Sequence, residues 1–198
     1  MKSNKGRRFP VEPINAVEAR AIFAACSPRC PTGIRNKGLL VLLYRGGLRI
    51  SEALSVLPKD IDSVAGSVRV LRGKNKTSRL VGLDAGAFAV LNVWLERRAR
   101  LGIGGRAPLF CTLKGAPLKT AYVRALLPRL ARRAGIARRI HAHAFRHAFA
   151  SELVAERTPL NLVQAALGHA SIATTDRYIK VLNPKAVVDA MRVREWTL

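Results

Sequence analysis

The sequence predicts a mainly α-helical domain with a small antiparallel β-sheet, an α+β fold. Apolar residues recur at helical spacing in several segments, for example at Phe88 and Leu91 after Asp84, a residue suited to cap a helix. Two short segments rich in β-branched residues, 67–71 and 78–83, flank a turn and predict a hairpin. Apolar residues make up 49% of the 198 residues, which is enough for a packed core.

The first part of the chain is predicted to be a basic, flexible segment, residues 1–14, followed by helices. Asn15 and Glu18 have the spacing of a capping box, so the first helix begins there. The next apolar run has apolar residues on nearly every side and predicts a buried helix that ends at the glycine pair 46–47. A third helix follows directly, which places Arg49 at its start, beside the core.

Further helices are predicted after the hairpin. One covers residues 120–134 and should be kinked by Pro128. Short helices follow between residues 141 and 178. We expect a single domain over residues 15–182 and a C-terminal helix within 183–198, because no internal repeat and no linker is evident.

The charge balance predicts a polyanionic partner. Lys and Arg number 35 against 12 Asp and Glu, a formal net charge of +23 that solubility alone does not require. Double-stranded DNA or RNA is the natural partner, with a generically basic surface as the alternative. The predicted DNA contacts are Lys76, Arg79, Arg124, Arg132 and Arg133.

Several classes of protein do not fit the sequence. No apolar run approaches the roughly 20 residues needed to cross a bilayer, and the charged N-terminus lacks the apolar stretch of a signal peptide. Cys26, Cys30 and Cys111 are too few and too irregularly spaced for a disulfide framework or a zinc site. We therefore expect a cytoplasmic, nucleoid-associated protein with free thiols and no metal or cofactor.

All four histidines lie in one stretch that starts at His141. His143, Arg146 and His147 are three and four residues apart, so they should share one helical face. A second helix is predicted to start with Thr158 as its cap and Pro159 at its first position.

The same stretch continues with a third short helix. Gly168 is suited to end the second helix, which places His169 just past its end. Ser171 can cap the third helix, in which Tyr178 falls two turns along. A cation, imidazoles and a phenol thus come from successive short elements, an arrangement suited to one small anionic group.

These residue types fit metal-free attack on a phosphodiester. Guanidinium groups such as Arg49 and Arg146 stabilise charge that grows on the non-bridging oxygens. Lys74, at the hairpin tip, is placed to protonate the leaving 5′ oxygen. Tyr178 can act as the nucleophile, with His143 to help remove its proton.

Four blocks of sequence resemble the motifs of the tyrosine recombinase, or phage integrase, family. GGLRISEAL, residues 46–54, resembles the first-arginine motif, and RGKNKTSRLVGL, residues 72–83, resembles the hairpin with the catalytic lysine. HAFRH, residues 143–147, resembles the His-x-x-Arg-His box. LGHASIATTDRY, residues 167–178, resembles the Leu-Gly-His…Tyr box. The blocks follow the family order and imply the family's catalytic-domain fold.

The resemblance also implies a role for each matched residue. Arg49 and Arg146 would clamp the scissile phosphate with help from His169, while Glu52 and His147 would support the site. In the same scheme Tyr178 forms the 3′-phosphotyrosyl bond, His143 assists proton transfer and Lys74 is the general acid.

Some assignments have alternatives. Lys76 is the alternative general acid to Lys74, because the alignment of the hairpin is loose. His143 and His147 have the spacing of metal ligands, but no third ligand is evident. Tyr178, taken alone, is also compatible with a half-buried core tyrosine.

The resemblance implies a site-specific recombinase or integrase that assembles as a homo-oligomer, a tetramer, on DNA. The C-terminal helix would pack on a neighbouring subunit. Family members usually carry a further helical domain before the catalytic one, so we expect either a catalytic fragment or a short form. The alternative functions are a type IB topoisomerase-like relaxase and a DNA-binding regulator that lacks strand exchange.

Overall fold

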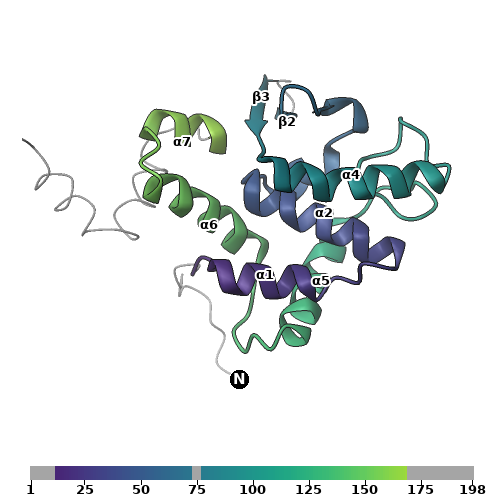
Figure 1. The fold of residues 1–198 in the computed structure, drawn as a ribbon, viewed down its shortest axis with the longest axis horizontal. Coiled ribbons are helices and arrows are strands. Elements are labelled where there is room, and N and C mark those ends of the chain that lie inside the picture. The colour runs from purple at the N-terminus through teal and green to yellow at the C-terminus, as the bar shows by residue number, and fades with distance from the viewer. Residues whose placement is uncertain (1–11, 73–76, 169–198) are drawn as a thin grey trace, which may run out of the picture.

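The computed structural model describes residues 12–72 and 77–168. Helices dominate this part of the chain, and a small antiparallel sheet in the order β1-β2-β3 lies at one side of them (Figure 1). The predicted α+β class is therefore confirmed. The C-terminal helix predicted within 183–198 and most of the predicted segment 1–14 lie outside the described residues. The elements are α1 (Ala16–Ala24), α2 (Pro31–Arg45), α3 (Ile50–Ser55), a 3-10 turn η1 (Pro58–Asp60), β1 (Ile61–Asp62), β2 (Ser67–Arg72), β3 (Thr77–Gly82), α4 (Ala85–Arg100), α5 (Thr120–Arg133), α6 (Ala142–Ala155) and α7 (Leu160–Leu167).

The helices α1 and α2 form as the sequence predicts. In α1, the Asn15 side chain accepts a hydrogen bond from the Glu18 backbone N–H at 2.9 Å, and the Glu18 carboxylate accepts from the Asn15 N–H at 3.0 Å. This reciprocal pair satisfies two N–H groups that a helix start leaves without partners. Helix α2 packs against α1, α3, α4 and α6, and its leucines, such as Leu39 and Leu42, are fully buried. It is the central helix of the described core.

The glycine pair after α2 makes the turn that leads to α3. Gly47 has φ of +60°, a conformation that residues with a Cβ adopt only with strain. A Cβ at this position would also lie 2.2 Å from Cδ1 of Phe149 in α6. Only glycine therefore permits the close packing of this turn on α6.

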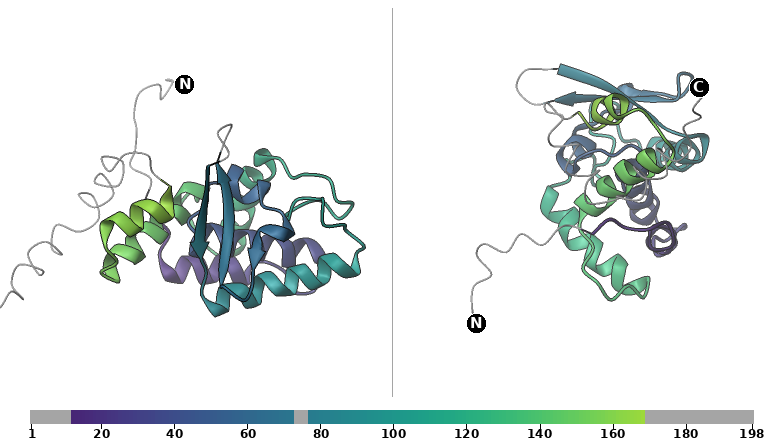
Figure 2. Two further views of the ribbon diagram at one scale, coloured as in Figure 1. Left: turned by 90° about the horizontal axis from the view of Figure 1, so that it is seen from above. Right: turned by 90° about the vertical axis from the view of Figure 1, so that its left-hand side faces the viewer.

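The predicted hairpin is present as β2 and β3. Its register pairs Val68 with Val81 and Val70 with Arg79. Side chains alternate between the two faces of a strand, so Arg79 shares the buried face with Val81, whereas Leu80 between them is 68% exposed. Helix α7 packs against β3, as the views in Figure 2 show.

One boundary differs from the prediction. Helix α7 begins at Leu160, with Pro159 as its N-cap, and not with Thr158 as the cap. The ψ of Pro159 is 137°, which keeps this residue extended, and the backbone N–H of Thr158 is already donated to the carbonyl of Leu153 at 2.9 Å. Gly168 ends α7 as predicted, with φ of +62°.

Helix α5 includes Pro128, which lies on its exposed side, while Val123, Leu127 and Leu130 face the core. None of the helices within residues 12–72 and 77–168 is long and apolar enough to span a membrane.

Candidate active site

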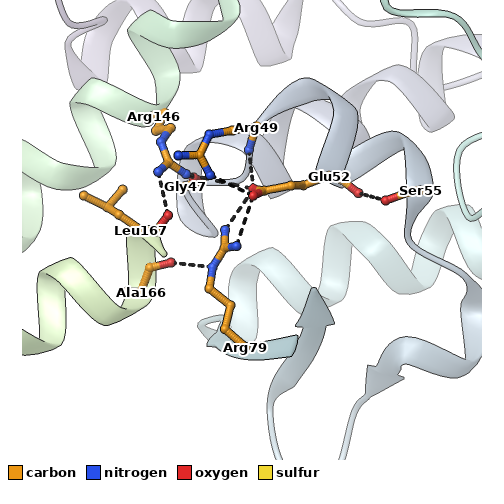
Figure 3. Close-up of polar contacts among 8 residues, drawn as sticks. All are labelled: Gly47, Arg49, Glu52, Ser55, Arg79, Arg146, Ala166 and Leu167. Carbon is orange, nitrogen blue, oxygen red and sulfur yellow. Dashed lines mark hydrogen bonds and ion pairs between the residues drawn. The ribbon is translucent and has the colours of Figure 1, made fainter. Parts of the chain in front are cut away.

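The candidate site centres on the carboxylate of Glu52, toward which guanidinium groups point from a turn, a strand and a helix (Figure 3). Arg49 is the N-cap residue of α3. Its backbone N–H donates to Glu52 Oε2 at 2.8 Å, and its Nη1 donates to Glu52 Oε1 at 2.9 Å. About a third of its side chain, 34%, is exposed, so Arg49 is more accessible to solvent than the other members of the cluster.

Arg146 reaches the site from the second turn of α6. Its side chain is only 3% exposed, and its Nη1 lies 4.0 Å from Glu52 Oε2. Nη1 donates to the carbonyl of Gly47 at 2.5 Å, and Nη2 donates to the carbonyl of Leu167 at 2.6 Å. Arg146 thus connects the turn before α3 with the end of α7, two segments far apart in the sequence.

The structure places Arg79, one of the predicted DNA contacts, inside the cluster. It was expected to contact DNA, but its side chain is 12% exposed and its guanidinium is directed inward. Nη1 and Nη2 donate to the two carboxylate oxygens of Glu52 at 3.1 and 2.9 Å, and Nε donates to the carbonyl of Ala166 at 2.9 Å. The physical reason is the alternation of β3, which puts residue 79 on the same face as buried Val81.

Glu52 is ionised in this environment. Burial disfavours its charged form, but the hydrogen bonds from Arg79 and from Arg49 outweigh burial and lower the pKa of Glu52 to about 2. Three guanidiniums around one carboxylate leave the cluster with a net positive charge. Such a cluster suits a small anion such as a phosphodiester.

The histidines of α6 lie beside this cluster. His143 is exposed overall, but the protein removes part of its imidazole from water, and this partial desolvation lowers its pKa together with the nearby charges of Arg146 and Arg49. Burial also lowers the pKa of His147 to about 4, together with the charges of His143 and Arg146. Both imidazoles are therefore neutral near pH 7, and His143 has the protonation state that a proton acceptor needs.

The remaining predicted residues fall into two groups. Arg124, Arg132 and Arg133 are exposed on α5, where a polyanion can reach them. The others lie outside the described residues: Lys74, Lys76, His169 and Tyr178.

Metal coordination finds no support in the described ranges. Among residues 12–72 and 77–168 no group of three or more His, Cys, Asp and Glu side chains is arranged to hold a metal ion. The absence of a metal from the reaction stays a prediction.

Sequence reasoning missed the contacts that hold the cluster together. The carbonyls of Gly47, Ala166 and Leu167 carry no signal in the sequence, because any residue supplies a carbonyl. The inward direction of Arg79 did have a signal in the sequence, because Arg79 stands two positions before the apolar Val81 of the same strand.

Comparison with known proteins shows the family of the chain. The model of the phage integrase family matches residues 13–184. A tyrosine recombinase XerC of Xylella fastidiosa (strain M23) is 38% identical over 148 residues, which are 75% of this chain and 49% of that protein. A tyrosine recombinase XerD of Ralstonia nicotianae is 35% identical over 170 residues, 85% of this chain and 55% of that protein. The chain spans about half the length of these curated relatives.

Solved structures show the same fold. The crystal structure of XerA recombinase superposes with a TM-score of 0.80 at 24% identity, over 96% of this chain and 68% of that one. XerH site-specific recombinase, in a post-cleavage complex with palindromic difH substrate, gives a TM-score of 0.77 at 29% identity, over 97% of this chain and 55% of that one. The family model covers most of the sequence, and the chain therefore belongs to the phage integrase family.

Proposed function

We propose that this chain is the catalytic part of a site-specific DNA recombinase that cleaves and rejoins DNA through a 3′-phosphotyrosyl intermediate without a metal. The observation that carries the proposal is the convergence of Arg49 and Arg146 beside Glu52. Two guanidiniums from separate elements are brought to one point, and a buried carboxylate fixes their positions. The names of the relatives and the DNA-bound XerH complex give it further support.

In the proposed reaction, Arg49 and Arg146 bind the non-bridging oxygens of the scissile phosphate, and His169 adds a further donor. The phenol oxygen of Tyr178 forms a bond to phosphorus while the bond from phosphorus to the 5′ oxygen breaks. His143 accepts the proton of the phenol, and Lys74 gives a proton to the leaving 5′ oxygen. Rejoining is the same sequence in reverse, with a 5′ hydroxyl of the partner strand as nucleophile.

The supporting residues act on these groups. Glu52 orients the guanidiniums, and His147 supports His143 from one turn further along α6. The exposed Arg124, Arg132 and Arg133, together with Lys76, would contact DNA phosphates and fix the position of the duplex. Strand exchange needs more than one active site, so the chain would act as a homo-oligomer, a tetramer, on DNA. The C-terminal helix would then pack on a neighbouring subunit, and the work would take place in the cytoplasm at the nucleoid.

A suicide substrate tests the proposal. This is a duplex with a nick near the cleavage site, so that the short fragment released by cleavage diffuses away and the covalent adduct accumulates. The wild-type chain should form an adduct that survives denaturing electrophoresis, and Tyr178→Phe should form none while still retarding DNA in a native gel. Tyr122→Phe is the matched control, because it also removes one phenol hydroxyl, and it should form the adduct.

Other outcomes point elsewhere. No adduct with the wild-type chain on its own target DNA contradicts the proposal and favours a DNA-binding regulator. An adduct with Tyr178→Phe shows that another residue is the nucleophile. An adduct accompanied by relaxation of one plasmid, without exchange between two duplexes, favours the relaxase.

A further inference from the structure

We propose that Arg79 is a positioning residue for the two phosphate-binding arginines, acting through Glu52 and through the end of α7, and that it does not contact DNA. This inference rests on the proposed recombinase function. It concerns how the free protein keeps Arg49 and Arg146 available for a phosphate.

The Glu52 carboxylate is shared by two arginines and a backbone N–H. Arg79 donates to both of its oxygens, and the Arg49 backbone N–H donates to Oε2 (Figure 3). The Arg49 guanidinium contributes one further bond, from Nη1 at 2.9 Å. Arg79 and a backbone N–H thus already satisfy the carboxylate, and the Arg49 side chain can exchange its single bond for a phosphate oxygen without leaving Glu52 unpaired.

Without Arg79, Glu52 would lose the arginine that binds both of its carboxylate oxygens. Glu52 is 7% exposed, so an uncompensated negative charge on its carboxylate is costly. The cations left beside it in the described part of the chain are Arg49 and Arg146. Glu52 would draw these guanidiniums toward itself and compete with the phosphate for them.

Arg79 also binds the C-terminal end of α7. The last carbonyls of a helix have no partner within the helix. Arg79 Nε binds the carbonyl of Ala166 at 2.9 Å, and Arg146 Nη2 binds the next carbonyl, that of Leu167, at 2.6 Å. Arg79 therefore holds the same helix end that Arg146 holds, and this end leads directly to residue 169.

Gly168 shows how closely Arg79 is packed there. A Cβ on Gly168 would lie 2.9 Å from Arg79 Nη1 and 3.1 Å from its Cδ. The glycine thus serves two purposes, because its φ of +62° ends α7 and its missing side chain leaves room for the guanidinium.

The salt dependence of the affinity for DNA distinguishes a positioning role of Arg79 from a direct contact with DNA. Each phosphate contact that is lost reduces the slope of log affinity against log salt concentration by about 0.9. In the Glu52→Gln background no carboxylate competes with the phosphate for Arg49 and Arg146. In this background Arg79→Ala should leave the slope unchanged, whereas Arg132→Ala, which removes an exposed arginine, should reduce it. A slope that Arg79→Ala reduces in this background would show that Arg79 does contact DNA and would overturn the inference.

Cleavage under single-turnover conditions at saturating DNA supplies the second readout. Arg79→Ala should lower the rate on the order of 10²-fold, because small displacements of catalytic groups have effects of this size. Arg69→Ala is the matched control, since Arg69 lies on the neighbouring strand and pairs with Asp60, and its rate should stay within about twofold of wild type. Wild-type cleavage tests the proposed function by itself, while the variant-to-wild-type ratio tests Arg79.

A rescue experiment addresses the role of Glu52. If Arg79 acts by satisfying this carboxylate, adding Glu52→Gln to Arg79→Ala should remove the competing charge. The double variant should then cleave DNA at least tenfold faster than Arg79→Ala alone. No recovery would overturn this part of the inference. Arg79→Lys, which keeps the charge but not the forked geometry, should fall between wild type and Arg79→Ala and serves if the alanine variant does not fold.

A measurement without cleavage completes the test. In ¹⁵N NMR spectra of the DNA-free protein, Arg79→Ala or Arg79→Lys should shift the Nε–H signal of Arg49. Adding Glu52→Gln should shift that signal again, since both changes alter what the Arg49 guanidinium binds. An Arg49 signal indifferent to these substitutions would contradict the inference whether or not the chain cleaves DNA.

Discussion

At Glu52 a buried carboxylate meets guanidinium groups from a turn, a strand and a helix. Its charge is what allows Arg49, Arg79 and Arg146 to lie so close together, because three like charges without it would repel one another. The cluster has more positive than negative charge, which would attract an anion. In the proposed reaction the site is therefore organised before the phosphate binds, which is how preorganised electrostatic stabilisation works.

The lowered pKa of His147 leads to a prediction about stability. Its pKa falls from an unfolded value near 6.5 to about 4 in the folded protein. Between these two pH values the unfolded chain binds a proton that the folded chain does not. The contribution of His147 to the free energy of unfolding is therefore fully present above pH 6.5 and is lost as the pH falls. From pH 6.5 to 5 we expect a loss of roughly 1–2 kcal/mol from this residue, allowing for partial solvent screening.

Urea unfolding at several pH values between 5 and 7 measures this loss. His143 contributes with the same sign, because its pKa is also lowered. The comparison is therefore between wild type and His147→Gln, which should unfold with a visibly flatter pH dependence. Identical pH dependence in both proteins would show that His147 titrates normally.

Among the elements, the turn between α2 and α3 has the greatest influence on the site. It sets the position of Arg49, and its carbonyl at Gly47 accepts a hydrogen bond from Arg146. A side chain here would meet Phe149 and strain the backbone. The same glycine thus controls the packing of α6 and the direction of both arginines.

Gly47→Ala should lower the free energy of unfolding by about 3 kcal/mol, combining a left-handed backbone with a steric overlap. Gly102→Ala is the control, because Gly102 also has a positive φ, +69°, but no heavy atom lies within 4 Å of its added Cβ. It should lose only the backbone part, about 1 kcal/mol. Equal losses in the two variants, measured by denaturant unfolding, would show that contact with Phe149 is unimportant.

The elements also show what the sequence could predict. Periodicity and caps were sufficient for α1, α2 and the hairpin, because apolar spacing and the Asn15–Glu18 pair act locally. The start of α7 was predicted one residue early, since an extended Pro159 depends on how the preceding segment leaves α6. The contacts of Arg79 with Glu52 and Ala166 could not be predicted from local signals, because they join a strand to two helices distant in sequence.

For the whole molecule, the site is a product of the tertiary fold. Arg49, Arg79 and Arg146 come from three separate regions, and the described core of α2, α4 and α6 holds these regions in place. The sequence has a net charge of +23, which in the proposed function would attract DNA without selecting a sequence. Under that proposal, affinity for DNA and catalysis at one phosphate depend on different residues.

In the proposed function, Arg49 and Arg146 act on the negative charge of one phosphate. A suicide substrate whose scissile phosphate is replaced by a methylphosphonate tests it most directly, because a methyl group takes the place of one charged oxygen. On the ordinary phosphodiester, Arg146→Ala should reduce adduct formation on the order of 10²–10³-fold, as expected for loss of a group that stabilises developing charge. On the methylphosphonate the same variant should lose less than tenfold relative to wild type, whereas equal losses on both substrates would contradict the claim.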